Sequence, residues 1–88
     1  MKIKGRFIVS EINGENYAVS LGGTETFHGM IRLNETGRDI FQGLLDGKGE
    51  EEIAAQLLKD YENVDIKLAK KAVDEMVEKL RNAGIVID

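Results

Sequence analysis

The first third of the chain alternates between apolar and polar residues in short runs, as expected for strands. Residues 7–12 are rich in β-branched and aromatic side chains, and Asn13-Gly14 follows, a dipeptide suited to a two-residue turn with positive φ at both positions. Residues 17–21 alternate strictly, which places Tyr17, Val19 and Leu21 on one face. After a second turn signal at Gly22-Gly23, a third strand is expected over residues 27–33, weakened locally by Gly29. The pattern predicts a three-stranded antiparallel meander.

Beyond residue 33 the apolar positions repeat with helical spacing, and three helices are expected. The first is capped by Asn34 and runs to about Asp46, the second begins at Glu50, and the third is capped by Asp65 and runs over residues 66–82. Their predicted buried stripes are Ile40, Phe41, Leu44 and Leu45; Ile53, Ala54, Leu57, Leu58 and Tyr61; and Ile66, Ala69, Val73, Met76, Val77 and Leu80. Residues 85–87 can return as a short strand. The order predicts an α+β domain with its helices on one side of the sheet.

Length and composition indicate a single globular domain over residues 1–88. The chain is 42% hydrophobic and 32% charged, which is ordinary for a folded domain. No apolar run approaches the roughly 18 residues that a membrane span needs, and the N-terminal residues contain no apolar signal core. We therefore expect a cytoplasmic protein with no membrane partner.

The side chains available for chemistry argue against an enzyme. The sequence has no cysteine and one histidine, which excludes thiolate catalysis, disulfides and a polyhistidine metal site within the chain. His28 has no identifiable acid–base partner, so a binding contact or a surface position is expected for it. Glu50, Glu51 and Glu52 point in different directions on a helix and do not converge on one ion. No catalytic residue, cofactor or metal is expected.

The third predicted helix has two mixed flanks beside its core face. One contains Lys70, Asp74, Val77 and Arg81, and the opposite one contains Leu68, Ala72, Glu75 and Lys79. A flank of charged and apolar side chains next to the core suits the wall of a shallow groove, although most helices of small proteins have such flanks.

The centre of the sequence resembles the PqqD family. The resemblance rests on residues 29–37, which end in Leu-Asn-Glu-Thr-Gly, and on the Leu-Leu-Asp-Gly that closes the following helix. An acidic start to the second helix and a long last helix closing with Leu80-Arg81-x-x-Gly84-Ile85 agree with it, so it covers residues 7–86. Ala72 stands where family members often have an acidic residue, and Met76 stands where an aromatic is common. These departures bear on peptide specificity more than on the fold.

The resemblance implies a winged-helix-like domain with three strands followed by three helices, acting as a RiPP recognition element. Such domains bind the leader segment of a ribosomally made precursor peptide and present it to a modifying enzyme, often a radical S-adenosylmethionine enzyme. The leader adds as an extra strand beside the third strand and packs against the third helix. For this sequence the implied peptide-binding residues are His28, Gly29, Met30, Ile31 and Arg32 on the strand, and Lys70, Asp74, Val77 and Arg81 on the helix. Asn34 and Gly37 are expected to fix the strand against the helices instead of touching the peptide.

Two other functions use the same architecture. A winged-helix nucleic-acid binder should gather basic residues on its recognition helix. Here the basic residues of the third helix are interleaved with Asp74, Glu75 and Glu78, and the net charge is −4, so nucleic acid is not the expected partner. A subunit that only bridges two proteins is the other alternative.

Overall fold

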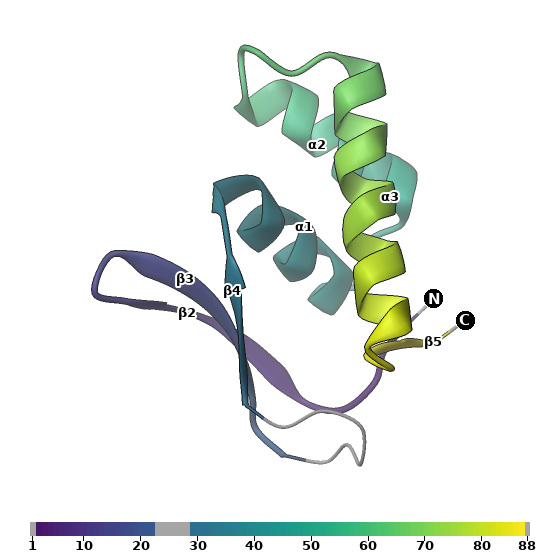
Figure 1. Cartoon of the computed structure of the whole chain (residues 1–88). Helices are drawn as coiled ribbons and strands as arrows, with labels where there is room; N and C mark the ends of the chain where they lie inside the picture. The colour runs from purple at the N-terminus through teal and green to yellow at the C-terminus, as the bar shows by residue number, and fades with distance from the viewer. Residues whose placement is uncertain (1, 23–28, 88) are drawn as a thin grey trace.

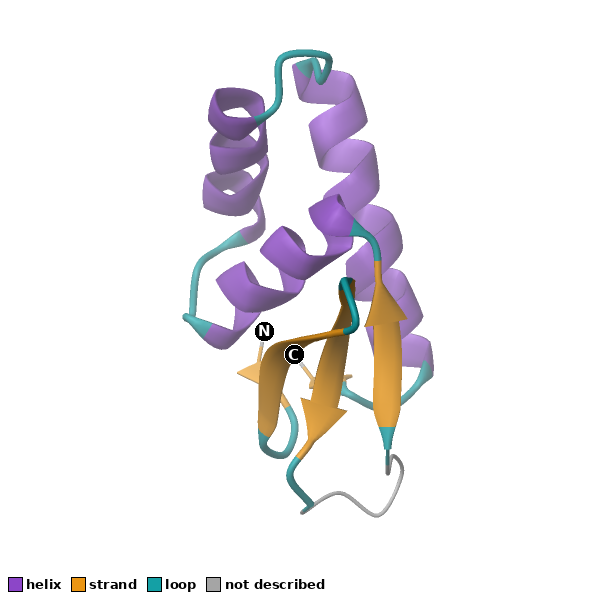
Figure 2. Cartoon of the chain, turned by 90° about the vertical axis from the view of Figure 1, so that its left-hand side faces the viewer, coloured by secondary structure: helices purple, strands orange, loops and turns teal. Residues whose placement is uncertain are grey.

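The structure is a computed structural model that describes residues 2–22 and 29–87. Its elements follow the order β1 (Lys2–Ile3), β2 (Phe7–Ile12), β3 (Glu15–Ser20), β4 (Met30–Leu33), α1 (Glu35–Leu45), α2 (Glu50–Asp60), α3 (Ile66–Asn82) and β5 (Val86–Ile87). The three helices lie on one side of the β2–β3–β4 sheet (Figures 1 and 2). The predicted α+β arrangement, a three-stranded antiparallel sheet followed by three helices, is confirmed.

The main sheet has the strand order β2-β3-β4, and both neighbouring pairs are antiparallel. Asn13 and Gly14 form the two-residue turn between β2 and β3 with φ of 52° and 80°, as the sequence predicts. The last strand is shorter than expected, because it begins at Met30 and Gly29 precedes it with φ of 114°. Phe27 and His28, where that strand was expected to begin, lie outside the described residues.

A second, two-stranded sheet joins the two ends of the described chain. β1 pairs with β5, with Ile3 opposite Val86. The short return strand at the end of the chain was expected, but β1 was not, because two residues carry no period-2 pattern.

The helix boundaries follow from local capping. The Asn34 side chain accepts a hydrogen bond from the Gly37 amide at 2.7 Å, and the Asp65 side chain accepts one from the Leu68 amide at 2.8 Å. Gly47, just beyond α1, has φ of 81°, the left-handed conformation that commonly follows a helix end. Helix α2 begins after Gly49 without a side-chain cap, and all three helices begin at the residues expected from the sequence.

The core lies between the inner face of the sheet and the three helices. Ala18 and Leu33 point inward from β3 and β4, and Phe7 packs edge-on against Phe41 of α1 at 5.6 Å between ring centres. Two members of the predicted stripes are exposed to solvent, Leu58 at 37% and Ile66 at 45%. Both lie near the corner where α2 ends and α3 begins, and no other helix or strand of the described residues covers that corner (Figure 1).

The outer face of the sheet points away from the helices. Ile8, Val19 and Met30 lie opposite one another across the three strands, and Ile8 and Met30 are 46% and 54% exposed. Within residues 2–22 and 29–87, no helix is long and apolar enough to cross a bilayer.

Candidate functional site

Among residues 2–22 and 29–87, no strand pairs with the β4 edge of the main sheet. The Ser20 amide donates to the Gly29 carbonyl at 2.9 Å, which marks that pair as hydrogen-bonded in the β3–β4 ladder. Hydrogen-bonded pairs alternate in an antiparallel ladder, so Ile31 and Leu33 also bond to β3. The N–H and C=O groups of Met30 and Arg32 therefore point away from the sheet and are available to an incoming strand.

The side chains of β4 alternate in the same way between the two faces. Leu33 is buried against the helices and Ile31 is half-buried, whereas Met30 and Arg32 are exposed on the outer face. Arg32 donates to Glu15 of β3 at 2.7 Å, and both side chains are largely exposed. Such an exposed pair contributes at most about 1 kcal/mol.

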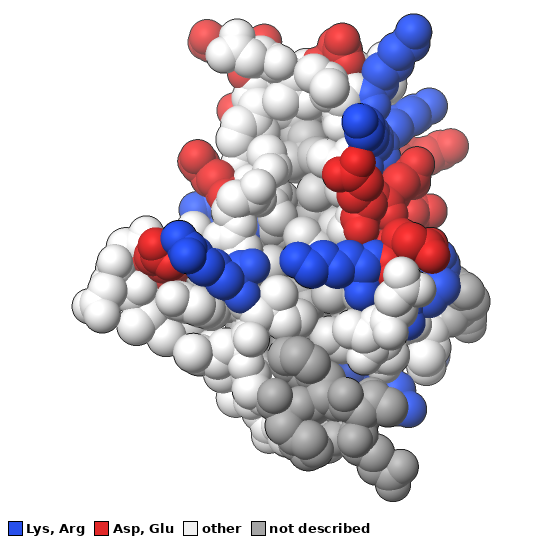
Figure 3. Space-filling model, in the orientation of Figure 1, with Lys and Arg blue, Asp and Glu red and all other residues white. Residues whose placement is uncertain are grey.

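A shallow hollow of about 200 Å³ lies where the N-terminal turn of α1 meets α3, next to the end of β4. It is lined by Asn34, Thr36, Gly37 and Ile40 of the α1 segment and by Ala72, Glu75, Met76 and Lys79 of α3. Figure 3 shows the same face, with uncharged surface between the sheet and α3 and with basic side chains that extend across the middle of it. We call the space between β4 and α3, which includes this hollow, the β4–α3 groove.

Gly37 fixes the depth of the groove. A Cβ placed on it would lie 2.9 Å from the Asn34 side-chain oxygen and 3.0 Å from the Met76 methyl. The first approach is shorter than real Cβ contacts and the second is very tight, so a side chain at position 37 would have to displace the Asn34 cap and the Met76 methyl. The expectation that Asn34 caps the helix and Gly37 permits close packing is confirmed.

The hollow next to the end of β4 is lined by Ala72, Glu75 and Lys79, which belong to the flank of α3 opposite the one predicted to contact the peptide. Lys70 and Asp74 line a separate hollow with Glu50 and Glu51 of α2, on the far side of the helix from Ala72 and Lys79. Val77 is 2% exposed and belongs to the core, so it offers no side chain to a groove.

Arg81, the remaining helical residue of the predicted site, contacts Glu78 at 3.1 Å on its own helix, and it does not line the β4–α3 groove. His28 lies outside the described residues. Sequence periodicity identified both flanks of α3 but carried no signal for which one faces β4.

A polar cluster fastens α1 to the end of α2, away from the groove. Tyr61 donates to the Asp39 carboxylate, and Arg38 donates to the same carboxylate at 3.0 Å. Burial, with the hydrogen bond to Asp39, raises the pKa of Tyr61 to about 12. The hydrogen bond to Asp39 also raises the pKa of Arg38. These groups hold the helices together, and Arg38 also lines a separate hollow with Arg32 and Leu33 of β4.

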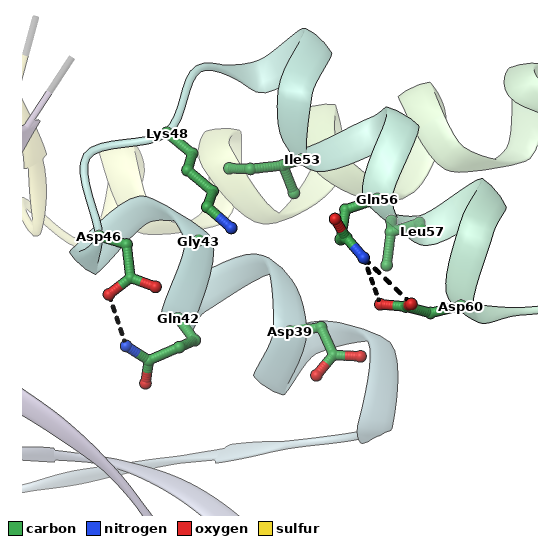
Figure 4. Close-up of a pocket in the computed structure, with 9 residues that line it drawn as sticks. All are labelled: Asp39, Gln42, Gly43, Asp46, Lys48, Ile53, Gln56, Leu57 and Asp60. Carbon is green, nitrogen blue, oxygen red and sulfur yellow. Dashed lines mark hydrogen bonds between the residues drawn. The ribbon is translucent and has the colours of Figure 1, made fainter.

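A larger hollow of about 340 Å³ lies between α1 and α2 (Figure 4). Two pairs of its polar side chains are hydrogen-bonded: Gln42 donates to Asp46 at 3.0 Å, and Gln56 donates to Asp60 at 3.1 Å. Gly43 and Ile53 form part of its floor. No group of three potential metal ligands occurs in the part of the chain that the structure describes. This hollow is therefore a largely polar surface between two helices.

The fold and its edge define the class: a winged-helix-like α+β domain with an open strand beside a helical groove. Residues 7–86 match the family model described as "Coenzyme PQQ synthesis protein D (PqqD)", and the chain belongs to this family. It is also similar to a solved structure described as "TbiB1 in Complex with the TbiA(beta) Leader Peptide", with 25% sequence identity, a TM-score of 0.73 and complete coverage of both chains. No curated protein sequence matches the chain significantly.

Proposed function

We propose that the chain binds the leader segment of a ribosomally made precursor peptide, which adds as a fourth strand along β4 and packs into the β4–α3 groove. The observation that carries the proposal is the open edge at Met30 and Arg32 beside a groove walled by α3. Main-chain hydrogen bonds to the edge supply affinity, and the groove selects side chains. Membership in the PqqD family and similarity to a protein solved with a leader peptide support it.

The partner that receives the peptide is a modifying enzyme, and we propose a radical S-adenosylmethionine enzyme. The chain acts as a peptide chaperone that holds the leader while the enzyme acts on the rest of the precursor, and it performs no chemical step itself. The absence of cysteine in the sequence supports this division of roles, because the chain cannot supply cysteine ligands to an iron–sulfur cluster.

The test is a titration of the isotope-labelled protein with the N-terminal segments of short peptides encoded beside its gene. One segment should bind, and the amide signals of Met30 and Arg32 should shift more than those of the Lys70–Asp74 side of α3. A DNA duplex at the same ionic strength serves as the control for the nucleic-acid alternative. If the duplex bound and no peptide did, peptide binding would be the wrong function.

A further inference from the structure

We infer that the peptide bound in the β4–α3 groove carries an apolar and an acidic side chain two residues apart, with the apolar one in the hollow around Met76 and the acidic one on Lys79. The inference deepens the proposed function and rests on it. Lys79 is then a residue that determines specificity, and the ligand is a peptide that binds as a strand and carries an acidic side chain.

The spacing of two follows from strand geometry. A strand added along β4 turns alternate side chains toward α3, on the same face as Ile31 and Leu33. β4 and α3 lie alongside each other and run in opposite directions (Figures 1 and 2). Neighbouring inward side chains of the peptide, roughly 6.6 Å apart, therefore meet successive turns of α3, which are about 5.4 Å apart.

The first inward position faces apolar surface. Met76 reaches the start of α1, where Leu33 also lies close to Gly37. This turn of α3 is therefore level with the C-terminal end of β4. Ala72 and Ile40 complete the apolar part of the lining, and Ala72 and Met76 are half-buried. An aliphatic or aromatic side chain opposite Leu33 would cover this surface and remove it from water.

The second inward position meets Lys79, one turn further along α3. Lys79 is exposed, lines the groove and has no ion-pair partner among residues 2–22 and 29–87. Glu75, the acidic residue of the same lining, lies within 4.0 Å of Lys71 on the solvent side. The charge left without a partner in the groove is therefore positive, and a carboxylate opposite Ile31 would complement it.

A random twelve-residue peptide library displayed against the immobilised protein tests this. Wild type should enrich sequences with an apolar and an acidic residue two positions apart. Lys79→Glu should retain the apolar preference and replace the acidic one with Lys or Arg. Synthetic copies of the enriched peptides should bind Lys79→Glu about fivefold more weakly than wild type, and the difference should shrink with added salt. The matched control is Lys70→Glu, a charge reversal on the opposite side of α3, which should leave the selected sequences unchanged.

The outcomes separate the two claims. The role of Lys79 is overturned if wild type enriches alternating apolar peptides without an acidic preference. It is also overturned if Lys79→Glu keeps the same acidic preference as wild type. Neither result contradicts strand addition. If wild type with an intact circular dichroism spectrum enriched no peptide at all, the proposed function would fail, and the inference with it.

Discussion

Tyr61 shows how a single side chain ties elements together that are distant in sequence. Its hydroxyl reaches back 22 residues to Asp39, which also binds Arg38. The predicted stripe of α2 includes Tyr61 as an apolar position, and the ring is indeed partly buried. The polar end of the side chain was not anticipated, because its partner lies on another helix.

Replacing Tyr61 with Phe tests this bond. The variant should lose about 1–2 kcal/mol of unfolding free energy at neutral pH, because the Asp39 carboxylate loses a donor while the ring still fills its site. Folding raises the pKa of Tyr61 from about 10 to about 12, so the protonated hydroxyl stabilises the folded state. This contribution is fully present below about pH 10 and is lost as the pH rises toward about 12.

Urea unfolding at pH 7, 10 and 12 gives the measurement. The gap in stability between wild type and Tyr61→Phe should be constant up to about pH 10 and should narrow at higher pH. Ultraviolet titration should also lose one transition near pH 12 in the variant. A gap that widened above pH 10 would contradict the assignment.

Helices α1 and α2 owe their close packing to a second glycine. A Cβ on Gly43 would lie 2.8 Å from Cγ1 of Ile53. An alanine in an open helix site stabilises it by roughly 0.5–1 kcal/mol relative to glycine. At position 43 this gain should be outweighed by overpacking, so Gly43→Ala should cost about 1–3 kcal/mol.

The double-mutant cycle with Ile53→Ala identifies the cause. In the Ile53→Ala background, Gly43→Ala should be neutral or stabilising, because the obstructing atoms are gone. Thermal unfolding of the four proteins measures the coupling. Additive losses would show that the cost of alanine does not come from contact with Ile53.

The effect of a proline substitution in β4 should alternate from one residue to the next along the strand. Proline removes one N–H and is tolerated on an edge strand where that N–H faces outward. Ile31→Pro should break the ladder to β3 and destabilise the fold. Met30→Pro and Arg32→Pro should keep the melting temperature within a few degrees yet weaken leader binding by about 1–3 kcal/mol.

Alanine variants at the same positions are the controls, since Arg32→Ala also removes the ion pair with Glu15 while keeping the N–H. Calorimetric titration with the leader peptide compares each pair. Equal affinity of the folded proline and alanine variants would rule out strand addition at this edge.

At the scale of the whole molecule, the prediction concerns the division of labour between chain and enzyme. In a reconstituted pathway, His28→Ala should reduce precursor maturation by less than about tenfold, equivalent to roughly 1.4 kcal/mol. The isolated chain should turn over neither peptide nor cofactor. Product formation measured by mass spectrometry checks both statements, and a loss of several orders of magnitude in a folded variant would reveal a catalytic role.

Features decided by neighbouring residues could be read from the sequence. The Asn13-Gly14 turn and the caps at Asn34 and Asp65 each depend on a few adjacent residues and their allowed φ angles. Alternation and helical spacing likewise determined most of the core. The Leu-Asn-Glu-Thr-Gly resemblance added the family, which the match over residues 7–86 confirms.

Only the tertiary structure decided what depends on how elements meet. Periodicity places Ala72 and Lys79 on one side of α3 and Lys70 and Asp74 on the other, but only packing decides that the first side meets the start of α1, next to the end of β4, and the second meets α2. For the same reason Val77 is in the core and Ile66 is exposed, although both belong to one apolar stripe. A helix sequence specifies which residues share a face, and the neighbours that cover that face come from other parts of the chain.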